Sequence, residues 1–270
     1  MRERPPRTRK GLFDPAVRRR GMQVVPNLFT TGALFAGFLA IVQSMDKHFE
    51  RAALAIFAAM ILDSLDGRVA RFTNTQSEFG AEFDSLSDMV SFGVAPALVV
   101  YEWTLNGFGR WGWMAAFFYC AMAALRLARF NTNIGVVDKR YFQGLPSPAA
   151  AAIVAGFVWL CNDKEIPVGK MGDHTPADWI AIVLTAYAGA TMFVNVPFYS
   201  GKDFNPRRWI PVTVGVTVIL VTVLALLAAS VDVPVAVFSL ALAYGLSGYV
   251  AWAWRRLRLG REPKRQQDLF

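Results

Sequence analysis

Residues 63–88 read DSLDGRVARFTNTQSEFGAEFDSLSD, a polar stretch that lies between two strongly apolar segments. It contributes four aspartates, Asp63, Asp66, Asp84 and Asp88, at the ends of those segments. A carboxylate near hydrocarbon is costly and indicates a functional role. Residues three or four positions apart share a helix face, so each pair of aspartates lies on one face. Two helices joined by a short loop can turn these faces toward each other, which places four carboxylates around one small volume.

A cation is expected between these carboxylates, because packed like charges repel one another. The ligand set is all oxygen, without Cys or His, which favours a hard divalent ion such as Mg²⁺ or Mn²⁺. Gly67 and Gly80 leave room for a ligand to approach the backbone. Arg71 lies one turn beyond Gly67, where it can meet a phosphate. The alternative is a set of helix-end carboxylates that are solvated at the membrane interface.

The spacing of the stretch is D-x2-D-G-x2-A-R-x8-G-x3-D-x3-D, and it resembles the signature of the CDP-alcohol phosphotransferase family, with all eight fixed positions filled. The resemblance implies a homodimeric membrane enzyme with two metal ions, which transfers a group from a CDP-linked lipid to an alcohol and releases CMP. The implied metal ligands are Asp63, Asp66, Asp84 and Asp88, and Asp88 is also the candidate catalytic base. The implied CDP-binding residues are Asp66, Gly67, Ala70, Arg71 and Gly80.

The residues around the last two aspartates indicate the acceptor. Residues 83–96, FDSLSDMVSFGVAP, are similar to the bacterial phosphatidylserine synthase branch of the family, with Ser87 in place of the usual Ala. Phosphatidylglycerophosphate synthases usually carry Pro and Lys where this chain has Ser85 and Met89. Two later stretches, RLARFN at 126–131 and FQGLPSP at 142–148, also resemble the serine branch. The resemblance implies CDP-diacylglycerol as donor and L-serine as acceptor, with glycerol 3-phosphate or inositol phosphate as the alternative acceptors.

Three residues at the end of the predicted fourth span, Arg126, Arg129 and Asn131, are candidates for acceptor or phosphate binding. An arginine fork can bind a carboxylate through two hydrogen bonds, and the same fork can bind a diphosphate. The spacing of the two arginines beside Asn131, close to the aspartates, favours such an anion site. The alternative is that both arginines only anchor the end of the span on the cytoplasmic side.

The rest of the chain has the composition of a polytopic membrane protein. Of its 270 residues, 54% are hydrophobic, and the mean hydropathy is +0.34. Several windows carry almost no charge over roughly eighteen residues or more. A helix of about this length is needed to cross the hydrocarbon core of a membrane. We therefore predict an all-α bundle of about eight transmembrane helices, a six-helix core plus two. The predicted spans cover residues 25–45, 50–63, 84–104, 111–129, 147–161, 177–196, 209–229 and 233–254.

The predicted organisation is one membrane domain with short basic ends. Residues 1–23 form a basic cytoplasmic arm that can hold an interfacial helix, and residues 24–205 form the family domain. Residues 206–256 hold the two additional helices, and residues 257–270 form a basic cytoplasmic tail. Both cysteines, Cys120 and Cys161, fall in apolar segments, where they are expected to be small core residues rather than a disulfide.

Charge predicts the orientation of this domain. The net charge is +8, but the basic residues cluster at span ends, which indicates anionic membrane lipid rather than nucleic acid as the partner. The predicted spans place 23 of the 28 Lys and Arg residues on the side that holds both termini and the aspartates. That side is the cytoplasm by the positive-inside rule, so we expect a multi-pass protein of the bacterial inner membrane. A divalent-cation transporter, the alternative of a different class, would place its ionisable residues near the bilayer midplane.

Overall fold

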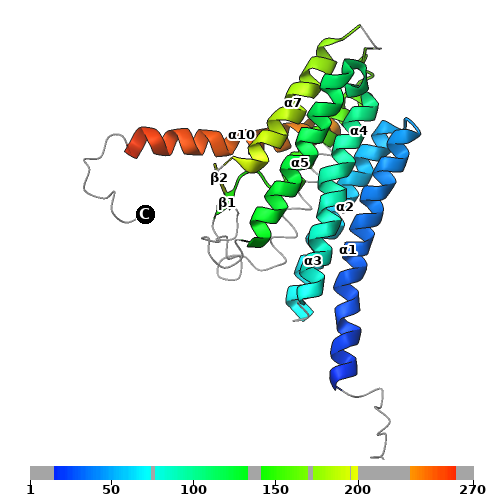
Figure 1. The fold of residues 1–270 in the computed structure, drawn as a ribbon, viewed down its shortest axis with the longest axis vertical. Coiled ribbons are helices and arrows are strands. Elements are labelled where there is room, and N and C mark those ends of the chain that lie inside the picture. Colours follow the sequence, from blue (N-terminus) through cyan, green and yellow to red (C-terminus); the bar gives the residue numbers. More distant parts are fainter. Residues whose placement is uncertain are drawn as a thin grey trace, which may run out of the picture.

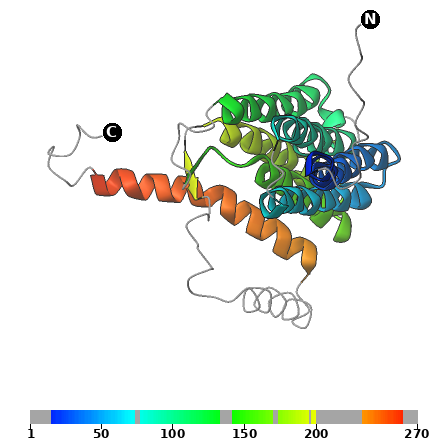
Figure 2. The same ribbon diagram turned by 90° about the horizontal axis from the view of Figure 1, so that it is seen from below.

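The computed structural model describes residues 15–73, 77–132, 141–169, 173–194, 196–199 and 232–259. The predicted seventh span at 209–229, and most of the basic arm and tail, lie outside these described residues. The described part is a bundle of helices that stand side by side, with one long helix running across it (Figures 1 and 2). The helices are α1 (Pro15–Met45), α2 (Phe49–Thr73), α3 (Glu78–Asp88), α4 (Ala95–Trp103), α5 (Arg110–Thr132), α6 (Ser147–Asp163), α7 (Pro176–Phe193) and α10 (Val233–Leu259).

The helical class is confirmed, with two local departures from the predicted spans. The predicted third span is a rod built from α3, the π-helical turn η1 (Met89–Val94) and α4, followed by the 3₁₀ turn η2 (Leu105–Phe108). A short antiparallel ribbon also pairs β1 (Tyr141–Gln143) with β2 (Pro197–Tyr199). Because β1 follows α5 and β2 follows α7, the ribbon ties together two chain segments at the ends of neighbouring helices.

Several helices meet the requirements of a membrane span. Within the part of the chain that the structure describes, five segments are long and apolar enough by length and composition. They are Asn27–Met45, Glu78–Trp103, Arg110–Thr132, Pro176–Phe193 and Val233–Val250. Helix α6 is shorter, at 17 residues, and the second half of α2 carries Asp63, Asp66 and two arginines. The protein is therefore an integral membrane helical bundle, whereas the count of eight spans stays a prediction.

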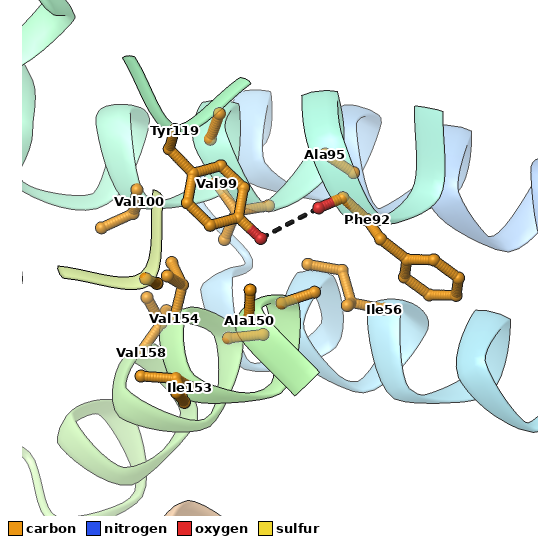
Figure 3. Packing of buried hydrophobic residues seen from close by; sticks show 14 of the residues in the cluster. Ile56, Phe92, Ala95, Val99, Val100, Tyr119, Ala150, Ile153, Val154 and Val158 are labelled. Carbon is orange, nitrogen blue, oxygen red and sulfur yellow. Dashed lines mark hydrogen bonds between the residues drawn. The ribbon is translucent and has the colours of Figure 1, made fainter. Parts of the chain in front are cut away.

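Small residues let the helices of the bundle approach closely. Helix α1 packs along α2, and α6 contacts α2, α7 and α10. The buried alanines of α1, α2 and α6 include Ala36, Ala40, Ala52, Ala59, Ala150, Ala151 and Ala155. Close backbone approach through small side chains is how helices usually associate in membranes, where lipid offers no hydrophobic driving force. Larger side chains from several helices, such as Ile56, Phe92 and Tyr119, fill the centre of the core (Figure 3).

Polar bonds fix the end of the bundle that is remote from the aspartates. Lys47 pairs with Glu102 at 2.7 Å, and Lys164 pairs with Asp232 at 2.6 Å. The buried Asp178 accepts hydrogen bonds from the hydroxyl of Thr104 and, at 2.7 Å, from the backbone N–H of Thr175. These bonds join α1 to α4, the end of α6 to the start of α10, and α4 to α7. The aspartates of the polar stretch lie at the opposite end, where α2, α3 and the end of α5 meet.

Candidate active site

The aspartate site is built by the second half of α2 and by α3. Helix α3 begins at the cap residue Ser77, whose hydroxyl accepts a hydrogen bond from the backbone N–H of Gly80 at 3.0 Å. This cap starts the helix so that Asp84 faces α2. One carboxylate oxygen from each of Asp63, Asp66 and Asp84 lies within 4.8 Å of the others. The two predicted helix faces therefore meet, and three of the four aspartates form one cluster.

The chemistry of this cluster fits a divalent cation. Asp66 is 5% exposed, and the buried Oδ1 of Asp84 has no hydrogen-bond partner among the described residues. Buried carboxylates without partners are costly, and a bound cation would supply the missing contact. Oxygen ligands suit Mg²⁺ or Mn²⁺. Asp88 adjoins the cluster, since it lines the same pocket as Asp63, Asp66 and Asp84.

Helix α1 supports the cluster through Thr30. The Thr30 hydroxyl donates a hydrogen bond to Oδ2 of Asp66 at 2.8 Å, and its side chain is 4% exposed. The backbone carbonyl of the same residue accepts a bond from the hydroxyl of Ser87 at 3.2 Å. Thr30 therefore touches both aspartate-bearing helices.

A pocket of ≈ 320 Å³ opens beside the aspartates. Its lining combines all four aspartates with two arginines and an apolar wall, and comprises Asp63, Ser64, Asp66, Gly67, Arg71, Asp84, Ser85, Asp88, Arg126, Leu127, Phe130, Pro146 and Pro148. Among the predicted CDP-binding residues, Asp66, Gly67 and Arg71 are in this lining, whereas Ala70 and Gly80 are not. A pocket with carboxylates beside arginines can hold a cation and a phosphate group together.

The two candidate arginines of α5 have different surroundings. Arg126 lines the pocket, is 9% exposed, and donates a hydrogen bond to the Ser147 hydroxyl at 2.7 Å. Arg129 lies outside the pocket lining and donates to the backbone carbonyls of Phe193 at 2.9 Å and Gln143 at 2.7 Å. Its guanidinium also lies 5.1 Å from the centre of the Phe193 ring. Arg129 therefore holds the ends of α7 and β1 together, and Arg126 is the arginine that faces the aspartates.

Asn131 reaches the rim of the pocket through a residue that was not among the predicted site residues. Its side-chain N–H donates to the hydroxyl of Ser85 at 3.0 Å, and Ser85 lines the pocket between Asp84 and Asp88. The bond joins α5 to α3 beside the carboxylates. One indication of this contact was present in the sequence, because Ser85 stands where a related branch usually carries Pro.

Comparison with known proteins places the chain among lipid-modifying transferases. A family model described as CDP-alcohol phosphatidyltransferase matches residues 23–194. The chain is 37% identical over 188 residues to a Helicobacter pylori protein named CDP-diacylglycerol–serine O-phosphatidyltransferase, covering 70% of this chain and 76% of that one. Proteins of the same name from Mycobacterium tuberculosis (40% over 151 residues, 53% and 52% covered) and Saccharomyces cerevisiae (37% over 172 residues, 57% and 61% covered) are also similar.

Proposed function

The chain belongs to the CDP-alcohol phosphatidyltransferase family, and we propose that it transfers the phosphatidyl group of CDP-diacylglycerol to the hydroxyl of L-serine. The products would be phosphatidylserine and CMP. The observation that carries the proposal is the pocket in which four aspartates lie together with Arg71 and Arg126. The names of the Helicobacter, Mycobacterium and yeast relatives support serine as the acceptor.

Asp63, Asp66 and Asp84 are the residues that would hold divalent cations, with Asp88 as the fourth carboxylate. Mg²⁺ or Mn²⁺ bound there, in our proposal as two ions, would supply charge neutralisation for the diphosphate. The donor would lie with its diphosphate at Arg71 and its CDP portion along α2, where Gly67 leaves the backbone accessible. A Cβ at Gly67 would lie 3.6 Å from Nη1 of Arg71, so the backbone of Gly67 is next to the guanidinium that would meet the diphosphate.

Asp88 is the proposed general base. It lines the pocket one turn beyond Asp84, and a carboxylate there can accept the proton of the serine hydroxyl. As that oxygen bonds to the phosphorus of the phosphatidyl group, the bond from the phosphorus to the CMP oxygen breaks. A positioned base typically contributes about 10²–10⁴-fold to the rate.

Arg126 is the proposed partner of the serine carboxylate. Its guanidinium is held by Ser147 and faces the pocket that contains Asp88. A serine whose carboxylate binds Arg126 can therefore present its hydroxyl toward Asp88. Arg129 is already engaged by backbone carbonyls of the ribbon and α7, so we assign it a scaffold role.

The cellular setting is proposed from charge and from resemblance. The distribution of Lys and Arg supports a cytoplasmic active site in a bacterial inner membrane. The two-copy assembly follows from the family resemblance. The position of the aspartates, at one end of the bundle, supports an enzyme at the membrane surface rather than a transporter.

The deciding experiment is CMP release by the full-length purified chain in mixed micelles with CDP-diacylglycerol and Mn²⁺. L-serine, glycerol 3-phosphate and inositol phosphate would be offered separately, and the lipid product would be identified by mass spectrometry. We expect serine-dependent CMP release with phosphatidylserine as the product. Release that depends on another acceptor would keep the family chemistry and overturn the assignment of serine.

A further inference from the structure

The rod that carries Asp84 and Asp88 changes its helical period directly after Asp88. The turn η1 (Met89–Val94) is π-helical, and it ends with the N–H of Ala95 donating to the carbonyl of Val90, five residues back. A π-helical turn holds an extra residue and is often found at functional sites. Here it sets how the aspartate half of the rod is rotated relative to α4.

The cause of the turn is visible in the sequence. Pro96 lies inside the rod and has no N–H, so it cannot donate to the carbonyl of Phe92, four residues earlier. A proline ring also clashes with the carbonyl at that position of a regular α-helix, and the wider turn relieves this clash. Phe92 is fully buried, and a buried carbonyl without a donor is costly.

Tyr119 of α5 supplies the missing donor. Its hydroxyl donates to the Phe92 carbonyl at 2.9 Å, and both residues are 0% exposed (Figure 3). Gly93, the next residue of the turn, packs on Ala123, because a Cβ built on Gly93 would lie 3.3 Å from the Ala123 Cβ. Tyr119 and Arg126 are seven residues apart and so share one face of α5. The face that brings Arg126 to the pocket therefore also holds the turn.

Helix α1 holds the other side of the same turn. The hydroxyl of Ser91 donates to the carbonyl of Ala33 at 3.0 Å. Gly37 makes this approach possible, since a Cβ at Gly37 would lie 2.5 Å from Oγ of Ser91. The turn after Asp88 is therefore held between α1 and α5. The bond from Ser91 fixes it to α1, and the bond from Tyr119 of α5 replaces the donor that Pro96 lacks.

We propose that Tyr119 is a positioning residue for the reaction: by holding the π-helical turn, its hydroxyl sets the placement of Asp88 against Arg126. The inference rests on the proposed role of Asp88 as the base. Tyr119 does not line the pocket and acts only through the backbone of the rod. Its effect should therefore be on the chemical step and not on binding of the donor.

The test compares Tyr119→Phe with Tyr187→Phe in the full-length protein. Tyr187 is a matched control, because its hydroxyl also donates to a backbone carbonyl at 2.9 Å, that of Gly245, but joins α7 to α10 away from the pocket. We expect Tyr119→Phe to lower kcat by roughly 10- to 100-fold, the range typical of a misplaced reacting group. The KM for CDP-diacylglycerol should stay unchanged. The Mn²⁺ affinity measured by electron paramagnetic resonance should fall by much less than kcat, because Asp63 and Asp66 lie on α2 and not on the rod. Tyr187→Phe should keep the wild-type kcat.

Stability is separated from positioning by the double variant Pro96→Ala/Tyr119→Phe. An alanine in place of Pro96 would give the Phe92 carbonyl an N–H donor, so the decrease in thermal midpoint caused by Tyr119→Phe should be reversed. The double variant can also be measured if Tyr119→Phe alone does not fold. We expect its kcat to stay low, because an α-helical turn would rotate Asp88 away. Recovery of kcat together with stability would overturn the inference, as would an unchanged kcat in Tyr119→Phe or a collapse of its Mn²⁺ affinity. Serine-dependent turnover by the wild type, measured in the same assay, tests the proposed function separately.

Discussion

The support that Thr30 gives to Asp66 leads to a quantitative prediction. Thr30→Val keeps the shape of the side chain but removes the hydroxyl that donates to Oδ2 of Asp66 at 2.8 Å. A hydrogen bond to a charged group contributes about 1.5–3 kcal/mol. Because about 1.4 kcal/mol corresponds to a factor of ten in affinity, the loss should weaken divalent-metal binding by roughly 10- to 100-fold. The same range is found when groups that orient metal ligands are removed elsewhere.

The measurement is a Mn²⁺ titration of the full-length protein in detergent, followed by electron paramagnetic resonance. Thr30→Ser keeps a hydroxyl and should bind Mn²⁺ nearly as well as the wild type. Thr31→Val is the matched control on the same helix, because the Thr31 hydroxyl donates only to the backbone carbonyl of Asn27 among the bonds that the structure describes. Its Mn²⁺ affinity should not change.

Two results would refute this reasoning. Wild-type Mn²⁺ affinity in Thr30→Val would mean that Asp66 needs no support from α1, or that it is not a metal ligand. Equal losses in Thr30→Val and Thr31→Val would mean that packing of α1, and not the hydrogen bond, controls the site. A loss confined to Thr30→Val, with recovery in Thr30→Ser, is the expected outcome.

Four further predictions concern the metals, the base, the arginines and the topology. Chelation by EDTA should abolish CMP release and Mg²⁺ or Mn²⁺ should restore it; full turnover after chelation would remove the metals from the mechanism. Asp88→Asn should lower kcat by about 10²–10⁴-fold with a smaller effect on donor binding, and a primary loss of donor affinity would make Asp88 a ligand rather than the base. Arg126→Lys should raise the KM for serine by roughly tenfold or more, since a lost hydrogen bond between charged groups costs about 1.5–3 kcal/mol. Arg129→Lys should lower the thermal midpoint and leave the KM for serine unchanged. The reverse pattern would exchange the roles of the two arginines. Reporter fusions after Phe270 and within residues 199–208 should read cytoplasmic, and fusions within residues 163–173 should read external. An external C-terminus would mean a miscounted span.

The faces of the aspartate helices could be predicted because they depend only on spacing. Positions three and four apart fix which side chains share a face, and residues 74–76 are too few to allow α3 to lie far from α2. The structure accordingly brings Asp63, Asp66 and Asp84 together. The length of each apolar segment predicted the helical class, because that length also depends on one stretch of sequence and not on distant contacts. The roles of these aspartates as ligands, and of Asp88 as base, stay predictions.

The contacts between distant helices could not be predicted from spacing. Arg126 and Arg129 have the same residue type and lie one turn apart. Only the tertiary contacts of α5 decide which one faces the pocket, through the bonds of Arg126 to Ser147 and of Arg129 to Phe193. The ribbon depends on pairing between residues far apart in the sequence, in strands of only three residues. Pro96 was a signal present in the sequence that the prediction of a regular third span did not use.

The charges that line the pocket explain why the metals and the donor should depend on each other. Four aspartates and two arginines leave two negative charges in the lining when all are ionised. The diphosphate of the donor is itself negative, so donor and pocket would repel each other without cations. One divalent ion would neutralise the pocket alone, whereas two would leave enough positive charge to balance the diphosphate as well. Serine carries one charge of each sign at neutral pH and does not alter this balance. The charge count therefore favours two ions, and it accounts for the expectation that chelation by EDTA abolishes CMP release.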